Sequence, residues 1–136
     1  FAILFTSITT PQFTYFIDSL DARMSSLGWN RIEPGSQVLD RIPIRSVTIY
    51  GHPSRSSRMT VDFSTYPEWR ELIENPDPGD VVAAGYGYIY MDSTWWDQLT
   101  LEQQSSLNQN CVQVDQEMGD ETSENWRHLL DISGCK

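Results

Sequence analysis

The stretch GYGYIYMDSTWWDQL (residues 85–99) contains a strand pattern followed directly by a helix pattern. Alternate positions hold tyrosines, which share one face if the segment is extended; they are Tyr86, Tyr88 and Tyr90. Asp92 and Ser93 then supply side chains that cap helices, ahead of TWWDQL. The stretch therefore predicts a strand over residues 81–92, broken near its glycines, that leads into a helix.

Helical and extended patterns alternate along the rest of the chain. Residues 11–28 repeat apolar side chains at helical spacing, and residues 65–75 and 100–108 each begin with a capping-box sequence headed by threonine. Between the last two, NPDPGD predicts a break. β-branched and aromatic runs predict strands over residues 37–40, 45–50, 59–63, 111–118 and 126–133. Because helices lie between strands, we expect one compact α/β domain: a mixed β-sheet with helices packed on it.

The first ten residues, FAILFTSITT, form an apolar segment (1–10) ahead of the α/β domain at 11–136. The segment is shorter than the roughly 20 apolar residues of a membrane span. It also lacks the basic start and the cleavage site of a whole signal peptide. Two interpretations stay open: a buried strand, or the end of a preceding transmembrane helix. Because the chain starts at Phe1 and not at Met, we expect a processed chain or part of a longer protein.

The charge balance is acidic: 19 Asp and Glu against 9 Lys and Arg give the 136 residues a net charge of −10. Such a surface repels phosphate backbones, so we expect no nucleic-acid partner. Arg55 and Arg58, in the segment HPSRSSR, stand out in so acidic a chain. They are suited to an anionic headgroup or a phosphate; the alternative is a solvated loop.

The two cysteines, Cys111 and Cys135, allow a single pairing. A bridge would tie down the C-terminal tail and contribute roughly 3 kcal/mol in the chain-entropy model. The alternative is a pair of free buried thiols in a cytosolic protein. We favour the bridge because a near-terminal thiol would otherwise be exposed and reactive. A bridge implies an oxidising, extracytoplasmic location.

The aromatic side chains of residues 85–99 have two interpretations. As a platform, the tyrosines with Trp95 or Trp96 would stack on a sugar; as core, they would pack under the helices. Adjacent tryptophans at a helix start point in different directions, so one can be buried while the other lies at an interface. We favour core and interface, and we keep as candidate binding residues Tyr86, Tyr88, Tyr90, Trp95, Trp96, Arg55 and Arg58.

The sequence shows no catalytic, metal or cofactor motif, and we expect no catalytic residue, metal or cofactor. GYGY lacks the third glycine of a dinucleotide fingerprint, and no Walker loop, HExxH, CxxC or GxSxG occurs. An unmarked acid/base site would have to pair Asp92 with His52 or His128. The acidic residues between 115 and 121 lack the calcium-loop pattern, which favours a solvated face.

Four parts of the chain resemble a known family: DARMSSLGWNRI with GSQVLD, then IRSVTIYGHP, then DVVAAGYGYIYMDSTWWDQLT, and finally CVQVDQE with WRHLLDISGC. They resemble the C-terminal extracytoplasmic domain of bacterial polytopic membrane proteins. Those proteins are similar to glycosyltransferases that use a lipid-linked sugar donor, the dolichyl-phosphate-mannose mannosyltransferase type. The resemblance covers the chain from about Asp21 onward. It carries over no catalytic residue, because the catalytic acid of such enzymes lies in a loop between membrane helices that has no counterpart here.

These observations suggest two functions of different classes. A third is a small enzyme that uses the pair of Asp92 with His52 or His128. The first is a non-catalytic extracytoplasmic domain of a larger membrane protein, glycosyltransferase-like. It would position an acceptor and contact the membrane-embedded remainder of the protein or another subunit. The alternative is a stand-alone secreted module that binds a carbohydrate or a protein. An upstream coding region rich in apolar spans would favour the first function, and exposed tyrosine rings in a groove would favour the second.

Overall fold

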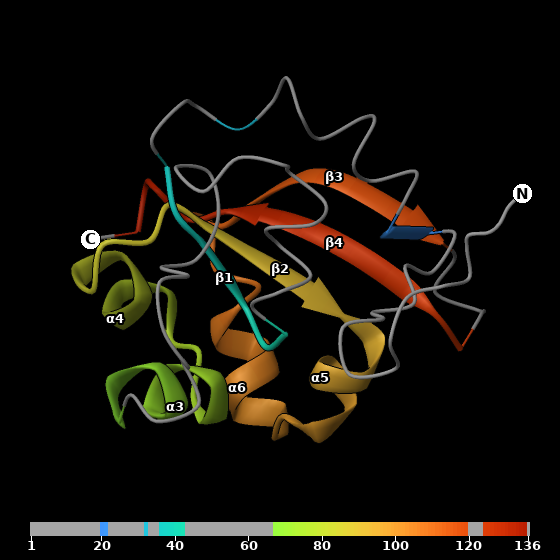
Figure 1. Ribbon diagram of the computed structural model, residues 1–136, viewed down its shortest axis with the longest axis horizontal. Coiled ribbons are helices and arrows are strands. Elements are labelled where there is room, and N and C mark those ends of the chain that lie inside the picture. Colours follow the sequence, from blue (N-terminus) through green and yellow to red (C-terminus); the bar gives the residue numbers. More distant parts are fainter. Residues whose placement is uncertain (1–19, 22–31, 33–35, 43–66, 120–123, 136) are drawn as a thin grey trace, which may run out of the picture.

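Four strands of the described chain form one sheet in the order β1-β2-β4-β3 (Figure 1). They are β1 (Val38–Asp40), β2 (Tyr88–Asp92), β3 (Gln113–Gly119) and β4 (Trp126–Asp131). β1 pairs with β2 in parallel, and the other two pairs are antiparallel. The structure is a computed structural model, and it describes residues 20–21, 32, 36–42, 67–119 and 124–135.

Four of the described helices lie on one side of this sheet, as Figure 1 shows. They are α3 (Pro67–Glu74), α4 (Pro78–Ala83), α5 (Ser93–Gln98) and α6 (Leu101–Ser106). The first two connect β1 to its parallel neighbour β2, and the other two connect β2 to β3. A mixed sheet with helices packed on it in one compact domain confirms the predicted α/β class.

Alternation along β2 divides the core into two clusters. Ile89 and Met91 point toward the helices, where they pack with Leu39, Val81 and Trp95. Tyr88 and Tyr90 point to the opposite face, where they pack with further buried side chains; these are Ile32, Val38, Met118 and Leu129. The sheet is therefore covered on both faces, which explains why all five residues of β2 are buried.

The strand predicted for residues 81–92 is wrong in its first half, because α4 occupies residues up to Ala83. Asp77 caps this helix by accepting a hydrogen bond from the Asp80 backbone N–H (3.2 Å), and Pro78 suits the first turn. Gly85, with φ of 102°, turns the chain toward β2. As a result Tyr86 packs in the helix-side cluster, and not on the face that Tyr88 and Tyr90 share.

The caps predicted around α5 and α6 are confirmed. The Asp92 carboxylate accepts a hydrogen bond from the Trp95 backbone N–H at 2.7 Å. Thr100 and Gln103 form the reciprocal capping box, with distances of 3.1 and 3.0 Å. Two short helices therefore follow β2 in immediate succession, and their positions are set by local side-chain hydrogen bonds.

The predicted disulfide is confirmed: Cys111 and Cys135 are bridged, with 5.0 Å between their Cα atoms. It joins the residues just before β3 to those just after β4, and Cys135 is buried. The bridge therefore ties the C-terminal end to the sheet. Within the described ranges, no helix has both the length and the apolar character that crossing a membrane requires.

Several predictions fall outside the described residues. They include the apolar segment 1–10, the strands at 45–50 and 59–63, and the side chains His52, Arg55 and Arg58. Of the helix predicted over residues 11–28, the structure describes Leu20 and Asp21, and both are helical.

Candidate functional site

A hollow of about 520 Å³ lies on the helix-covered face of the sheet, bordered by residues of α5, β3 and β4. We call it the tryptophan groove, because its aromatic wall contains Trp96 and Trp126, together with His128. Met91 and Leu130 from the core also line it. Asp97 and Glu117 contribute exposed carboxylates. The groove thus combines flat apolar surfaces with hydrogen-bond acceptors.

The aromatic wall is a contiguous arrangement of three half-buried rings. Trp96 and Trp126 meet edge to face, with 6.0 Å between ring centroids and 66° between ring planes. The Trp126 ring also lies against His128, with centroids 4.4 Å apart. Offset and edge-to-face pairs of this kind are the favoured geometries of aromatic contacts. Each ring is therefore held by another ring while part of its surface stays accessible.

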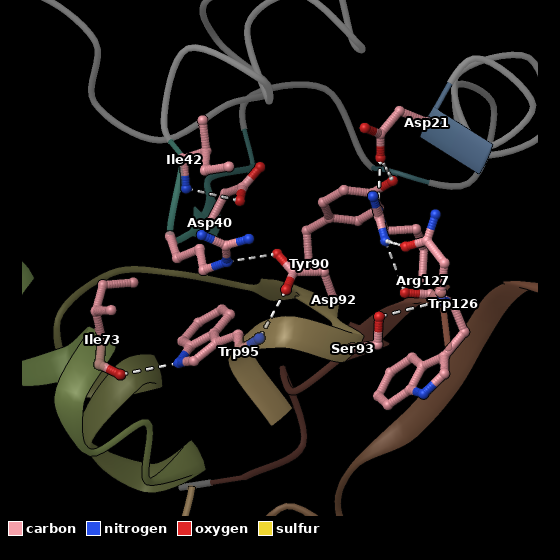
Figure 2. Close-up of polar contacts among 12 residues, drawn as sticks. Asp21, Asp40, Ile42, Ile73, Tyr90, Asp92, Ser93, Trp95, Trp126 and Arg127 are labelled. Carbon is pink, nitrogen blue, oxygen red and sulfur yellow. Dashed lines mark hydrogen bonds and ion pairs between the residues drawn. The ribbon is translucent and has the colours of Figure 1, made fainter. Parts of the chain in front are cut away.

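Alternation and a backbone contact position the β4 side of the groove. Trp126 and His128 are two residues apart in β4 and so point to the same face as Leu130. The Trp126 backbone N–H donates a hydrogen bond to the Ser93 hydroxyl at 3.3 Å, shown in Figure 2. Ser93 is the first residue of α5, so this contact links the start of β4 to the helix that carries Trp96.

A β-bulge brings Glu117 to the groove. Val114 pairs with Leu130, but the next pairs are Gln116 with Leu129 and Glu117 with His128, so Asp115 is the extra residue. Val114 and Glu117 are three positions apart and would lie on opposite faces of a regular strand. The extra residue places both on the groove face, which is how bulges re-aim side chains near binding and active sites.

Gly119 allows the end of β3 to lie close to Trp126. Its φ is 88°, and an added Cβ would lie 2.6 Å from the Asn125 carbonyl oxygen and 2.8 Å from the Trp126 Cα. We expect Gly119→Ala to lower the free energy of unfolding by about 1–3 kcal/mol, through strain and backbone displacement. Urea denaturation measures this difference.

Gly87→Ala is the matched control for this substitution. Gly87 has no positive φ, and its added Cβ would meet no atom within 4 Å. Little change in stability is expected there. Equal effects at the two glycines would show that the hairpin does not need the close approach at Gly119.

Buried ionic contacts lie on the opposite face of the sheet and at the end of β2 (Figure 2). Asp21 is fully buried and accepts hydrogen bonds from the Tyr90 hydroxyl (2.7 Å) and the Arg127 Nε (2.8 Å). The Asp92 carboxylate accepts from the Arg41 Nε at 2.8 Å as well as from its capped helix. These contacts connect distant parts of the chain, so we assign them to stability and not to ligand binding.

The candidate binding residues have different places in the structure. Tyr86, Tyr88, Tyr90 and Trp95 are each at most 6% exposed, so they belong to the core and offer no ring face to a sugar. Trp96 alone among the five aromatics of residues 85–99 lines the tryptophan groove. The two candidate arginines lie outside the described residues.

The acid/base pair of Asp92 and His128 stays a prediction. His128 pairs with Met91 across the β2–β4 ladder, and Asp92 pairs with Arg127. The Asp92 carboxylate accepts hydrogen bonds from the Trp95 backbone N–H and the Arg41 Nε, whereas the His128 ring lies against Trp126 in the wall of the groove. In the described part of the chain, no group of three or more His, Cys, Asp or Glu side chains is placed to hold a metal ion.

Sequence reasoning missed Trp126, Asp97 and Glu117 as groove residues. Trp126 and His128 alternate at the start of the last strand, and that pattern is the signal that could have suggested one shared face. The position of Glu117 depends on a β-bulge, and no residue in QVDQEMG predicts that bulge. The meeting of Trp96 and Trp126, 30 positions apart, has no local signal.

Comparison with known proteins gives no match: no protein-family model, curated protein or solved structure matches this chain.

Proposed function

We propose that this chain is a non-catalytic extracytoplasmic domain of a larger membrane protein, glycosyltransferase-like, and that it positions a sugar-bearing acceptor in the tryptophan groove. The observation that carries the proposal is the groove itself: the half-buried Trp96 and Trp126 line one hollow together with the Asp97 and Glu117 carboxylates. Aromatic rings stack on the apolar face of a sugar, and carboxylates accept hydrogen bonds from its hydroxyls.

The size of the groove supports a small acceptor group. Its volume of about 520 Å³ falls within the range of about 300–1,000 Å³ in which small-molecule sites usually lie. Its lining mixes apolar surfaces with a few polar groups, as such sites do. A short oligosaccharide end fits this description better than an extended protein surface.

The proposed location is supported by the Cys111–Cys135 disulfide. Structural disulfides persist in oxidising compartments and are rare in the cytosol. The location also agrees with the resemblance of the sequence to extracytoplasmic domains of membrane glycosyltransferases. The partner would then be the membrane-embedded remainder of the same protein or another subunit.

A stand-alone secreted carbohydrate-binding module is the second candidate, and the same groove favours it. The two candidates differ in what precedes this domain in the gene. Many apolar spans encoded upstream would support the membrane protein, and a signal peptide directly before Phe1 would support the secreted module. Both require a ligand in the groove.

Ligand binding can be tested by NMR titration of the full chain with short oligosaccharides, observing the indole N–H signals. We expect the Trp96 and Trp126 signals to shift and the Trp69 signal, which lies outside the groove, to stay. Trp126→Ala should weaken binding about tenfold, because the substitution removes one of the two indole rings on which the sugar would stack.

Trp69→Phe is the control, since it removes a tryptophan of α3 that does not line the groove. It should leave the affinity unchanged. The absence of any shift at the groove indoles with neutral, acidic and amino sugars would contradict the proposed function. Equal loss of affinity in both variants would place the ligand elsewhere.

A further inference from the structure

We propose that the tryptophan groove selects an amino sugar, a ring whose free ammonium group enters beside the Asp97 and Glu117 carboxylates. This inference rests on the proposed function and names the chemical class of its ligand. Selectivity would come from charge and aromatic surface together, so the neutral and acetylated forms of the same sugar would bind more weakly.

Charge complementarity is the first argument. The described residues that line the groove include two carboxylates, Asp97 and Glu117, and no Lys or Arg. Both carboxylates are exposed, so they are accessible to a ligand from solvent. The whole chain, these two carboxylates included, has a net charge of −10, which favours the approach of a cation.

The arrangement of the rings is the second argument. Trp96 and Trp126 stand at 66° to each other, so a ligand in the groove can meet two aromatic surfaces at an angle. A cation within about 6 Å of a tryptophan face is attracted by the negative face of the ring, and more strongly where water is excluded. The sugar ring can stack on one indole while its ammonium group lies near the other.

The bulge in β3 is the third and independent argument. Regular pairing would send Glu117 to the opposite face of the sheet, away from Val114 and the groove. The extra residue, Asp115, instead places Glu117 opposite His128 and within the lining. Bulges interrupt pairing at a cost and are found where a side chain must be re-aimed. The bulge therefore places at the groove a carboxylate that regular pairing would place on the other face.

The test compares three tetrasaccharides with one backbone that differ only at the second ring carbon: free ammonium (chitosan), N-acetyl (chitin) and hydroxyl (cellulose). Calorimetry and indole N–H shifts are recorded at low salt and mildly acidic pH, where the amine is protonated. We expect the chitosan tetrasaccharide to bind about tenfold tighter than the other two, and to shift the Trp96 and Trp126 signals.

Three charge variants separate the groove from diffuse attraction by the acidic surface. Asp97→Asn and Glu117→Gln keep the side-chain shape, and each should weaken chitosan binding about three- to tenfold. Glu102→Gln removes the same charge from the exposed first turn of α6, outside the groove lining, and should leave the affinity unchanged. Far-ultraviolet circular dichroism confirms that each variant is folded.

The outcomes distinguish this inference from the proposed function. If all three sugars bind at the groove with equal affinity, the ammonium selectivity is overturned and the proposed function stands. If no sugar shifts the groove indoles, both are overturned. If Glu102→Gln weakens chitosan binding as much as Asp97→Asn does, the attraction is diffuse and the selectivity is overturned.

Discussion

Replacing Arg127 by Met will lower the free energy of unfolding by about 3–5 kcal/mol, because it removes the guanidinium that pairs with the buried Asp21 carboxylate. The Arg127 side chain is 8% exposed and the Asp21 side chain 0%, and their contact is 2.8 Å long. After the substitution, Asp21 keeps the hydrogen bond from the Tyr90 hydroxyl but loses the guanidinium. Equilibrium unfolding in urea measures the loss.

Two further variants make this prediction specific. Arg70→Met removes the same side chain from the exposed surface of α3 and should cost no more than about 1 kcal/mol. The double variant Asp21→Asn with Arg127→Met should be more stable than Arg127→Met alone, because no charge stays buried and Asn still accepts from Tyr90. A loss for Arg127→Met no greater than that for Arg70→Met would contradict the assignment of this ion pair to the core.

Trp95→Ala will have an effect of similar size, about 3–5 kcal/mol, because it removes one of the largest fully buried side chains of the described core. Trp95 is 1% exposed and packs in the helix-side cluster. Its indole N–H also donates a hydrogen bond to the Ile73 carbonyl oxygen at 2.9 Å, which ties α5 to α3. Thermal and urea unfolding should both show the loss.

Trp96→Ala is the control one residue further along the same helix. Trp96 is half-buried at the groove, so the same substitution there should cost clearly less stability. Trp95→Phe keeps most of the apolar volume and should fall between wild type and Trp95→Ala, which allows a measurement even if the alanine variant fails to fold. Equal losses of stability for Trp95→Ala and Trp96→Ala would contradict the prediction that burial of Trp95 stabilises the packing of the helices on the sheet.

The helix layer was predicted well where local side-chain chemistry decides it. Asp92 and Thr100 cap their helices as expected, because a cap involves residues only three positions apart. Helix α4 was missed because its cap, Asp77, and Pro78 lie within NPDPGD, a sequence that also suits a turn. Both faces of β2 are buried, so the alternation of its side chains gave no indication of which face a ligand could reach.

The candidate site could be predicted only in part. Trp96 was named among the binding residues, and one of two adjacent tryptophans was expected at an interface; Trp96 lies at the groove while Trp95 lies in the core. The tyrosine platform was a less favoured alternative, and the burial of Tyr88 and Tyr90 leaves it without an exposed surface. Which aromatic side chains stay accessible depends on what packs over them, and that is a property of the whole fold.

Features that depend on near neighbours or on composition follow from the amino-acid sequence alone. They are the α/β class, the caps at Asp92 and Thr100, and the single possible pairing of Cys111 with Cys135. Contacts between distant side chains depend on the fold: Asp21 meets Arg127, Trp96 meets Trp126, and Glu117 lines the groove. The two kinds of feature differ in how far apart along the chain the interacting residues lie. Caps and strand alternation act over a few residues, whereas these contacts require the register of β3 on β4 and the packing of helices on the sheet.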